Sequence, residues 1–114
     1  ETRILADRAT HSGNERITVI GRWRPEGGGS NYIEVAKQMN ATYLDIDTST
    51  AARLTPEQFN QVNGQFLRDA VARGDRIFLG TEIGRMVGQL AWEIEFLATE
   101  LGLVLGPGGW FVPG

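Results

Sequence analysis

Apolar positions along the chain follow two periods in turn, which predicts strands that alternate with helices. Short runs rich in β-branched and aliphatic residues are typical of buried strands, and they lie at 17–21, 41–47 and 76–81. Apolar residues at three- and four-residue spacing predict helices at 31–39, 56–73 and 87–101. Residues 1–16 are polar without a sustained period, so we expect an irregular lead-in with a short helix around 4–8.

This alternation favours an α/β fold. Strands that are joined through helices are usually parallel and connected by right-handed crossovers. The predicted architecture is a small three-layer α/β sandwich with a mostly parallel sheet of four to five strands. Two last apolar runs, 103–105 and 110–112, flank a Gly-Pro-Gly-Gly turn. They are compatible with a hairpin that would make the sheet mixed at one edge.

Two helix starts have clear capping signals. Thr55 precedes Pro56, and Gln58 stands at the position from which its side chain can complete a capping box. The same helix should end at Gly74. Asn31, followed three residues later by glutamate, predicts a second capped start.

Length and composition limit the classes of function. With 114 residues, 41% hydrophobic and 22% charged, the chain is sufficient for one domain, 1–114, and too short for two. It has no cysteine and one histidine, which excludes disulfides, thiolate zinc sites and histidine-rich metal centres. We therefore expect no metal and no cofactor. The first residue is Glu1 and not methionine, which predicts a piece of a longer polypeptide.

The charge balance is acidic. The net charge of -3 argues against indiscriminate nucleic-acid binding, although ten of the eleven basic residues are arginines, which suit phosphate recognition. A GC-rich genome would produce the same arginine bias. No apolar run approaches the roughly 20 residues that span a bilayer, so we expect no stable membrane insertion.

Several polar residues come directly after predicted strands. In open α/β sheets, ligands bind beyond the carboxyl ends of the strands, so these residues should lie together. They are Arg22, Trp23 and Arg24; Asp45 and Asp47; and Thr81, Glu82 and Arg85. The two aspartates could hold Mg²⁺ or act as acid and base, but they fit a strand end or a helix cap better.

The last predicted helix carries a glutamate beside its apolar face. A helical wheel places Val87, Leu90, Ile94, Leu97 and Leu101 together as the buried stripe. Glu93 borders this stripe, whereas Trp92 and Phe96 point largely away from it. The aromatic pair needs a partner, which is the rest of this domain, another protein or a stacked base. Within the domain, the N-terminal segment is the expected cover.

Four segments carry a family resemblance that covers roughly residues 17–100. The strings VIGRW, NYIEVAKQMNATYLDI, FLRDAVARGDRIFLGTEI and WEIEFL resemble the C-terminal toxin domains of contact-dependent growth inhibition proteins and Rhs-type polymorphic toxins. The resemblance implies an antibacterial domain on a secreted or cell-surface effector that acts in the cytoplasm of the target bacterium. It also implies a cognate immunity protein as partner. Many such domains are nucleases, and tRNA is a frequent target.

On this resemblance the leading hypothesis is a metal-independent ribonuclease that cuts tRNA, with or without a host protein factor. The neighbouring 2′-hydroxyl would attack the phosphate, and the protein would supply a base, an acid and positive charge. The residues expected to bind and stabilise phosphate are Arg22, Arg24 and Arg85. Trp23 or Tyr32 would stack a base, and Asp45 would also contact substrate. Glu82, Glu93 or His11 would move protons, and Thr81 would donate a hydrogen bond.

Two alternative functions belong to other classes of protein. The chain is also loosely similar to TIR-like and deoxyribosyltransferase-like folds, which cleave N-glycosidic bonds. In that case Glu93 would stabilise a ribosyl cation and the arginines would hold the NAD pyrophosphate. A non-catalytic protein-binding module would instead use Trp92 and Phe96 as its contact surface.

Overall fold

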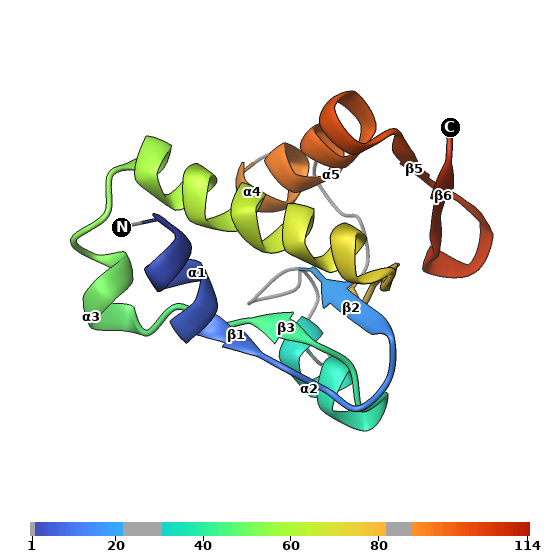
Figure 1. Ribbon diagram of the computed structural model, residues 1–114, viewed down its shortest axis with the longest axis horizontal. Helices are drawn as coiled ribbons and strands as arrows, with labels where there is room; N and C mark the ends of the chain where they lie inside the picture. Colours follow the sequence, from blue (N-terminus) through green and yellow to red (C-terminus); the bar gives the residue numbers. More distant parts are fainter. Residues whose placement is uncertain (1, 22–30, 82–87) are drawn as a thin grey trace.

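The computed structural model describes residues 2–21, 31–81 and 88–114, and it shows an α/β arrangement in that part of the chain (Figure 1). The helices are α1 (Thr2–Ala9), α2 (Tyr32–Gln38), α3 (Thr48–Ala51), α4 (Pro56–Arg73) and α5 (Gly88–Leu101), with a 3₁₀ turn at Pro107–Gly109. The strands are β1 (Thr10–His11), β2 (Ile17–Ile20), β3 (Tyr43–Leu44), β4 (Arg76–Leu79), β5 (Leu103–Leu105) and β6 (Phe111–Pro113). The predicted α/β class is confirmed.

The predicted sheet of four to five mostly parallel strands is wrong. The described strands form three two-stranded sheets, of which β2–β4 is parallel and β1–β3 and β5–β6 are antiparallel. Single bridges join them, from Thr18 to Thr42 and from Phe78 to Trp110. The pairing is interrupted because segment 41–47 changes partner. Thr42 exchanges hydrogen bonds with β2, whereas the next residues pair with β1.

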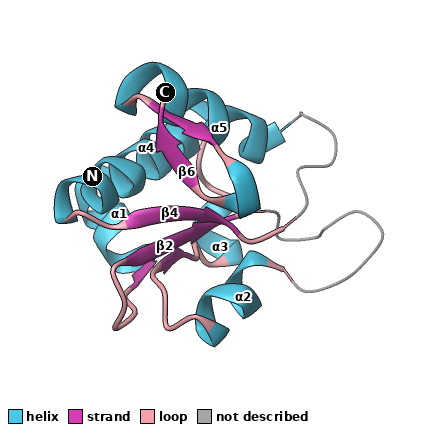
Figure 2. Ribbon diagram, turned by 90° about the vertical axis from the view of Figure 1, so that its right-hand side faces the viewer, coloured by secondary structure: helices cyan, strands magenta, loops and turns pink. Residues whose placement is uncertain are grey.

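Helices cover both faces of the β2–β4 pair (Figure 2). Side chains alternate along a strand, so neighbouring residues of β2 enter different cores. Ile20 packs in the larger cluster with Phe66 and Leu97 of α4 and α5, whereas Val19 packs with Ala36 of α2. The central strand pair therefore separates α2 from α4 and α5. The carboxyl end of β2 lies between these helices.

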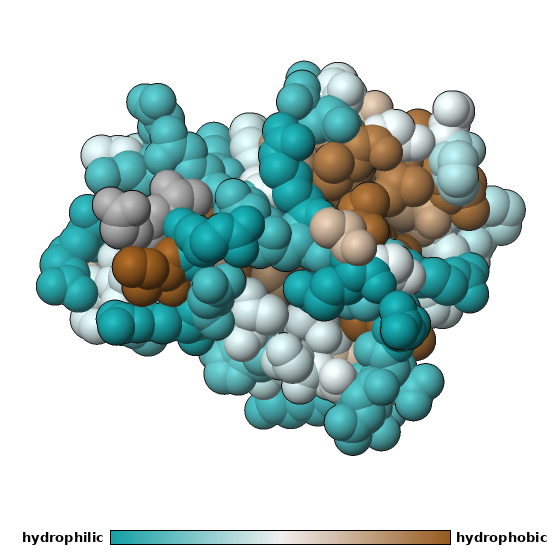
Figure 3. Space-filling model, viewed as in Figure 1, coloured by the Kyte–Doolittle hydropathy of each residue, from teal (hydrophilic) through white to brown (hydrophobic). Residues whose placement is uncertain are grey.

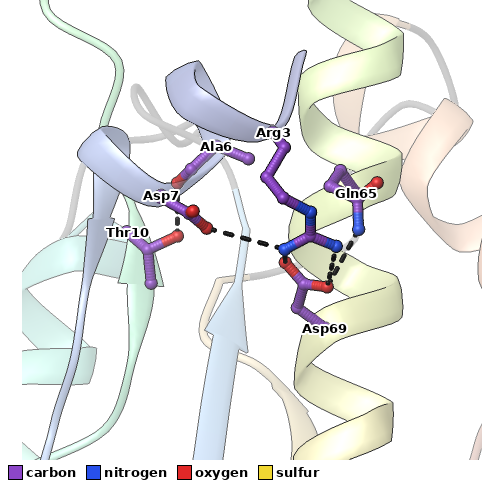
Figure 4. A network of polar contacts seen from close by, with 6 residues as sticks. All are labelled: Arg3, Ala6, Asp7, Thr10, Gln65 and Asp69. Carbon is purple, nitrogen blue, oxygen red and sulfur yellow. Dashed lines mark hydrogen bonds and ion pairs between the residues drawn. The ribbon is translucent and has the colours of Figure 1, made fainter. Parts of the chain in front are cut away.

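The N-terminal segment is more ordered than its sequence pattern predicts. Residues 2–9 form a full helix that packs along α4 because Ala6 and Ala9 are buried. Figure 4 shows how polar contacts support this packing: Arg3 lies 3.2 Å from Asp69 of α4, and Asp69 also accepts a hydrogen bond from Gln65. The short helix expected around 4–8 is confirmed as part of α1, which is longer than predicted. The strand β1 was not predicted, and residues 12–16 are irregular as expected.

The capping predictions are confirmed. The Thr55 side chain accepts a hydrogen bond from the Gln58 backbone, and the Gln58 side chain accepts one from the Thr55 backbone. Asn31 caps α2 by accepting from the backbone of Glu34, and Gly74 ends α4 in the left-handed conformation, with φ of 85°. Local sequence therefore determines where these helices begin and end.

The hairpin compatible with 103–105 and 110–112 is also present, as β5 and β6. Val104 and Val112 on these strands stay partly exposed, and Figure 3 shows an apolar area on this side of the molecule. In the described part of the chain, no helix has both the length and the apolar character that crossing a membrane requires.

Candidate functional site

A pocket of about 700 Å³ lies where the carboxyl ends of β2 and β3 meet α4 and α5. Its volume is in the range of small-molecule sites, roughly 300–1,000 Å³. Its apolar wall includes Val19, Ile20, Leu44, Ile46, Phe59 and Phe66. Its polar lining consists of Tyr32, Asp45, Asp47, Asn63, Gln89 and Glu93. Among the described residues that line it, none is lysine or arginine.

Glu93 is the buried acid of this pocket. It lies on α5 beside the buried Leu90 and Leu97, and only 7% of its surface is exposed. Loss of solvation raises the pKa of Glu93 to about 8, against an ordinary value of 4.5, and a hydrogen bond from Asn63 acts in the opposite direction. Glu93 therefore holds its proton at neutral pH.

Asn63 on α4 is the neighbour of Glu93. It is 2% exposed, and its side-chain oxygen has no hydrogen-bond partner within the described structure. A buried acceptor without a partner costs about 1–3 kcal/mol, so such atoms are rare in folded proteins. Because Asn63 lines the pocket, a donor group on a bound molecule can supply this partner.

Tyr32 lies near two acids of the pocket, Glu93 and Asp45. Its hydroxyl group donates a hydrogen bond of 2.5 Å to the carbonyl oxygen of Leu44. Burial raises the pKa of Tyr32 strongly, and the nearby charges of Glu93 and Asp45 raise it further. These side chains from α2, α5 and the end of β3 are therefore close enough to influence one another.

The two aspartates that follow β3 have different roles. Asp47 caps α3, since it accepts hydrogen bonds from the Ser49 hydroxyl and from the hydroxyl and backbone of Thr50. These bonds lower the pKa of Asp47 to about 2. Asp45 is half-buried at the pocket. A joint magnesium site gains no support, because the described residues contain no cluster of three potential ligands from His, Cys, Asp and Glu.

Thr81 lies beside the pocket wall at Gly21. A Cβ atom at Gly21 would lie 2.7 Å from Cβ of Tyr32 and 2.8 Å from the Thr81 hydroxyl oxygen. Such separations are too short for carbon contacts, so glycine is required for this close approach. Gly21 thereby allows the chain after β4 to pack against the first turn of α2 at the pocket.

The structure brings together Tyr32, Asp45 and Glu93 from the predicted set, with Thr81 at the edge. His11 does not line the pocket; it is exposed on β1 and stacks on Tyr43, with ring centroids 4.8 Å apart. Five further predicted residues lie outside the part of the chain that the structure describes: Arg22, Trp23, Arg24, Glu82 and Arg85.

Sequence reasoning missed Asn63 and Gln89, because both are common helix-surface residue types. Asn63 had a detectable signal. It stands four residues after Phe59 and three before Phe66, so it interrupts the apolar stripe of α4. A polar residue at a core position of a helix often marks a polar pocket or network.

The aromatic pair on α5 has a partner within the domain, as one of the alternatives predicted. Trp92 and Phe96 stack on each other, with centroids 5.0 Å apart, and lie over Gly64 of α4. Arg68 of the same helix places its guanidinium 5.1 Å from the Phe96 ring. The intramolecular partner of this pair is therefore α4 and not the N-terminal segment.

No family model, no curated protein and no solved structure matches this chain. Functional inference therefore depends on the pocket itself.

Proposed function

We propose that this protein cleaves the N-glycosidic bond of a nucleoside or nucleotide in the pocket between β2, β3, α4 and α5. The observation that carries the proposal is the buried, protonated Glu93 in the same apolar pocket as Asp45. Enzymes that cleave glycosidic bonds combine an acid that keeps its proton with a carboxylate close to the sugar. The apolar wall offers a surface for the departing base.

The proposed reaction begins with protonation of the leaving group. Glu93 donates its proton to a ring nitrogen of the base as the bond between C1′ and the base breaks. The electron pair of that bond leaves with the base, and the carboxylate of Asp45 stabilises the ribosyl cation. Water then adds to C1′ and gives a proton to the Glu93 carboxylate, which restores the acid. Asn63 and Tyr32 would orient Glu93 and the sugar.

This chemistry suits the described pocket better than RNA cleavage does. Attack of a 2′-hydroxyl on phosphate builds negative charge, which cationic side chains must stabilise. The described lining supplies carboxyl, phenol and amide groups. Arg22, Arg24 and Arg85, which the ribonuclease hypothesis requires, lie outside the described residues, so that hypothesis remains a prediction and an outcome of the test.

The test is incubation of the purified protein with nucleosides, NAD and tRNA in separate reactions, followed by chromatography. We expect release of free base from a purine nucleoside, whose base has a free ring nitrogen, with a rate that falls above pH 8 as Glu93 loses its proton. Nicotinamide leaves NAD as a neutral base, so its release would not need this proton. Glu93→Gln should lower the rate about 10²–10⁴-fold, the usual contribution of a general acid. Discrete RNA fragments without free base would overturn the proposal.

The matched control is Glu95→Gln, which removes an exposed carboxyl from the same helix and should leave the rate unchanged.

A toxin role and an immunity partner are part of the same proposal. Expression in bacteria should then be toxic for the native chain and harmless for Glu93→Gln, and toxicity that survives this substitution would separate growth inhibition from the pocket.

A further inference from the structure

The α4 wall of the pocket places an amide between two aromatic rings. Phe59, Asn63 and Phe66 stand at positions i, i+4 and i+7 of the helix, so they share one face, and all three line the pocket. Phe59 is half-buried, whereas Asn63 and Phe66 are almost completely buried. A planar base that packs against this apolar wall can bring one edge to the amide of Asn63, one helical turn from either ring.

The Asn63 amide uses one of its two ends in the free protein. Its NH₂ group donates to Glu93, and its oxygen has no hydrogen-bond partner within the described structure. Less than 1 Å² of this oxygen is exposed, so bulk water does not serve as the missing donor. The terminal torsion of asparagine is broad, and a turn of the amide about it opens the oxygen to a donor in the pocket at low cost.

The neighbouring contact between the same two helices has no open acceptor of this kind. Asn60 stands three residues before Asn63 on α4, and its side-chain oxygen accepts a hydrogen bond of 3.0 Å from Gln89 of α5. Gln89 in turn stands four residues before Glu93, so the two polar pairs are successive contacts between α4 and α5. The unused acceptor therefore lies at the acid of the pocket and not at the amide pair beside it.

Glu93 and Asn63 together present a donor next to an acceptor. In the proposed reaction the Glu93 carboxyl donates to a ring nitrogen of the base, and the free oxygen of Asn63 can only accept. Adenine carries the complementary pair on one edge, with an acceptor at N7 and an amino donor at C6. Guanine has acceptors at both positions, and hypoxanthine shares its 6-oxo group.

We infer that Asn63 selects the base: its oxygen accepts from the 6-amino group of adenine while Glu93 donates to N7, so the substrates are adenine nucleosides. This inference rests on the proposed function and names its substrate class. A 6-oxo group would instead set a second acceptor against the Asn63 oxygen. As N7 takes the proton and the bond to C1′ breaks, the base becomes electron-poor and its amino group a stronger donor. The bond to Asn63 therefore strengthens toward the transition state, which favours adenine in kcat as well as in KM.

The kinetic test compares adenosine with inosine, which carries the 6-oxo group. For the native protein we expect kcat/KM to be about 5- to 150-fold higher for adenosine, the discrimination of a two-point base contact. Asn63→Leu removes the acceptor at similar volume and should abolish most of this preference. The same substitution also removes a neighbour of Glu93 and lowers both rates, so the ratio is the readout. The matched control is Asn60→Leu, one turn earlier on α4 and outside the pocket lining, which should leave the ratio unaltered.

Binding of free bases to the protein, measured by calorimetry, requires no cleavage. Adenine should bind the native protein about 5-fold or more tightly than hypoxanthine does. Glu93→Gln should keep this preference, because glutamine can donate to N7 and still accept from Asn63. The comparison of the two bases on native protein also decides the matter if Asn63→Leu fails to fold.

The two measurements separate this inference from the proposed function. If adenine is preferred in binding while no nucleoside is cleaved, the proposed reaction fails and base selection by Asn63 stands. If adenosine and inosine are cleaved with equal kcat/KM, the reaction stands and the inference is wrong. Absence of adenine binding, equal binding of adenine and hypoxanthine, or an adenosine preference that persists in Asn63→Leu would also overturn it.

Discussion

Asn63 of α4 donates a hydrogen bond to the buried carboxyl of Glu93 on α5, and its own side-chain oxygen has no partner among the described residues. Two buried polar residues thus face each other at the contact between α4 and α5. Neither residue gains stability from this position, since burial opposes the charged form of Glu93 and leaves an acceptor of Asn63 unpaired. Such an arrangement is typical of groups that are retained for binding or chemistry.

The stability of the protein should fall as pH rises, because of Glu93. In the unfolded chain this group has its ordinary pKa of 4.5, and in the folded protein the pKa is about 8. Between these values the folded state holds a proton that the unfolded state has released, so the free energy of unfolding decreases by about 1.4 kcal/mol per pH unit. Below pH 4.5 both states are protonated and the contribution is complete; above pH 8 it is lost.

Urea unfolding of native protein and Glu93→Gln at pH 5 and pH 8 measures this effect. Glutamine stays neutral, so the substituted protein should lose less stability over this range, and the difference between the two proteins isolates Glu93. Glu95→Gln, on the exposed side of α5, should behave as native. Parallel pH curves for native protein and Glu93→Gln would show that Glu93 is ionised at neutral pH.

Removal of the Tyr32 hydroxyl should destabilise the protein moderately. Tyr32→Phe deletes the hydrogen bond to the Leu44 carbonyl while it keeps the ring that packs between α2 and the strands. The expected loss is about 1 kcal/mol in the free energy of unfolding. Tyr43→Phe is the control, because among the described residues the Tyr43 hydroxyl forms no such hydrogen bond, unlike that of Tyr32. Equal losses of unfolding free energy in both variants would show that the hydrogen bond from Tyr32 to Leu44 does not contribute the expected stability.

The capping box of α4 should contribute stability without affecting the pocket. Thr55→Ala removes the bond to the Gln58 backbone at an exposed helix start, and N-cap substitutions of this kind cost about 1 kcal/mol. Thermal unfolding should show the loss, whereas the pH-dependent difference between native protein and Glu93→Gln should persist in the Thr55→Ala background. Thr99→Ala, inside α5, should cost far less because alanine favours helix interiors.

Local sequence was sufficient for most of the elements. Thr55 and Asn31 begin their helices and Gly74 ends one, as expected, since each cap acts on backbone groups within a few residues. The strand periods at β2 and β4 were equally clear. The sequence did not predict how the strands pair, because segment 41–47 divides its hydrogen bonds between two strands that are distant in sequence.

For the candidate site, the sequence by itself determined which chemical groups stand at strand ends and on the border of the α5 stripe, and Asp45 and Glu93 do line one pocket. It could not determine that Glu93 keeps its proton, that Asn63 faces it, or that Trp92 and Phe96 lie over α4. Periodicity and capping are short-range properties of the chain. Solvation and hydrogen-bond partners depend on which distant segments pack together, and only the tertiary structure decides this.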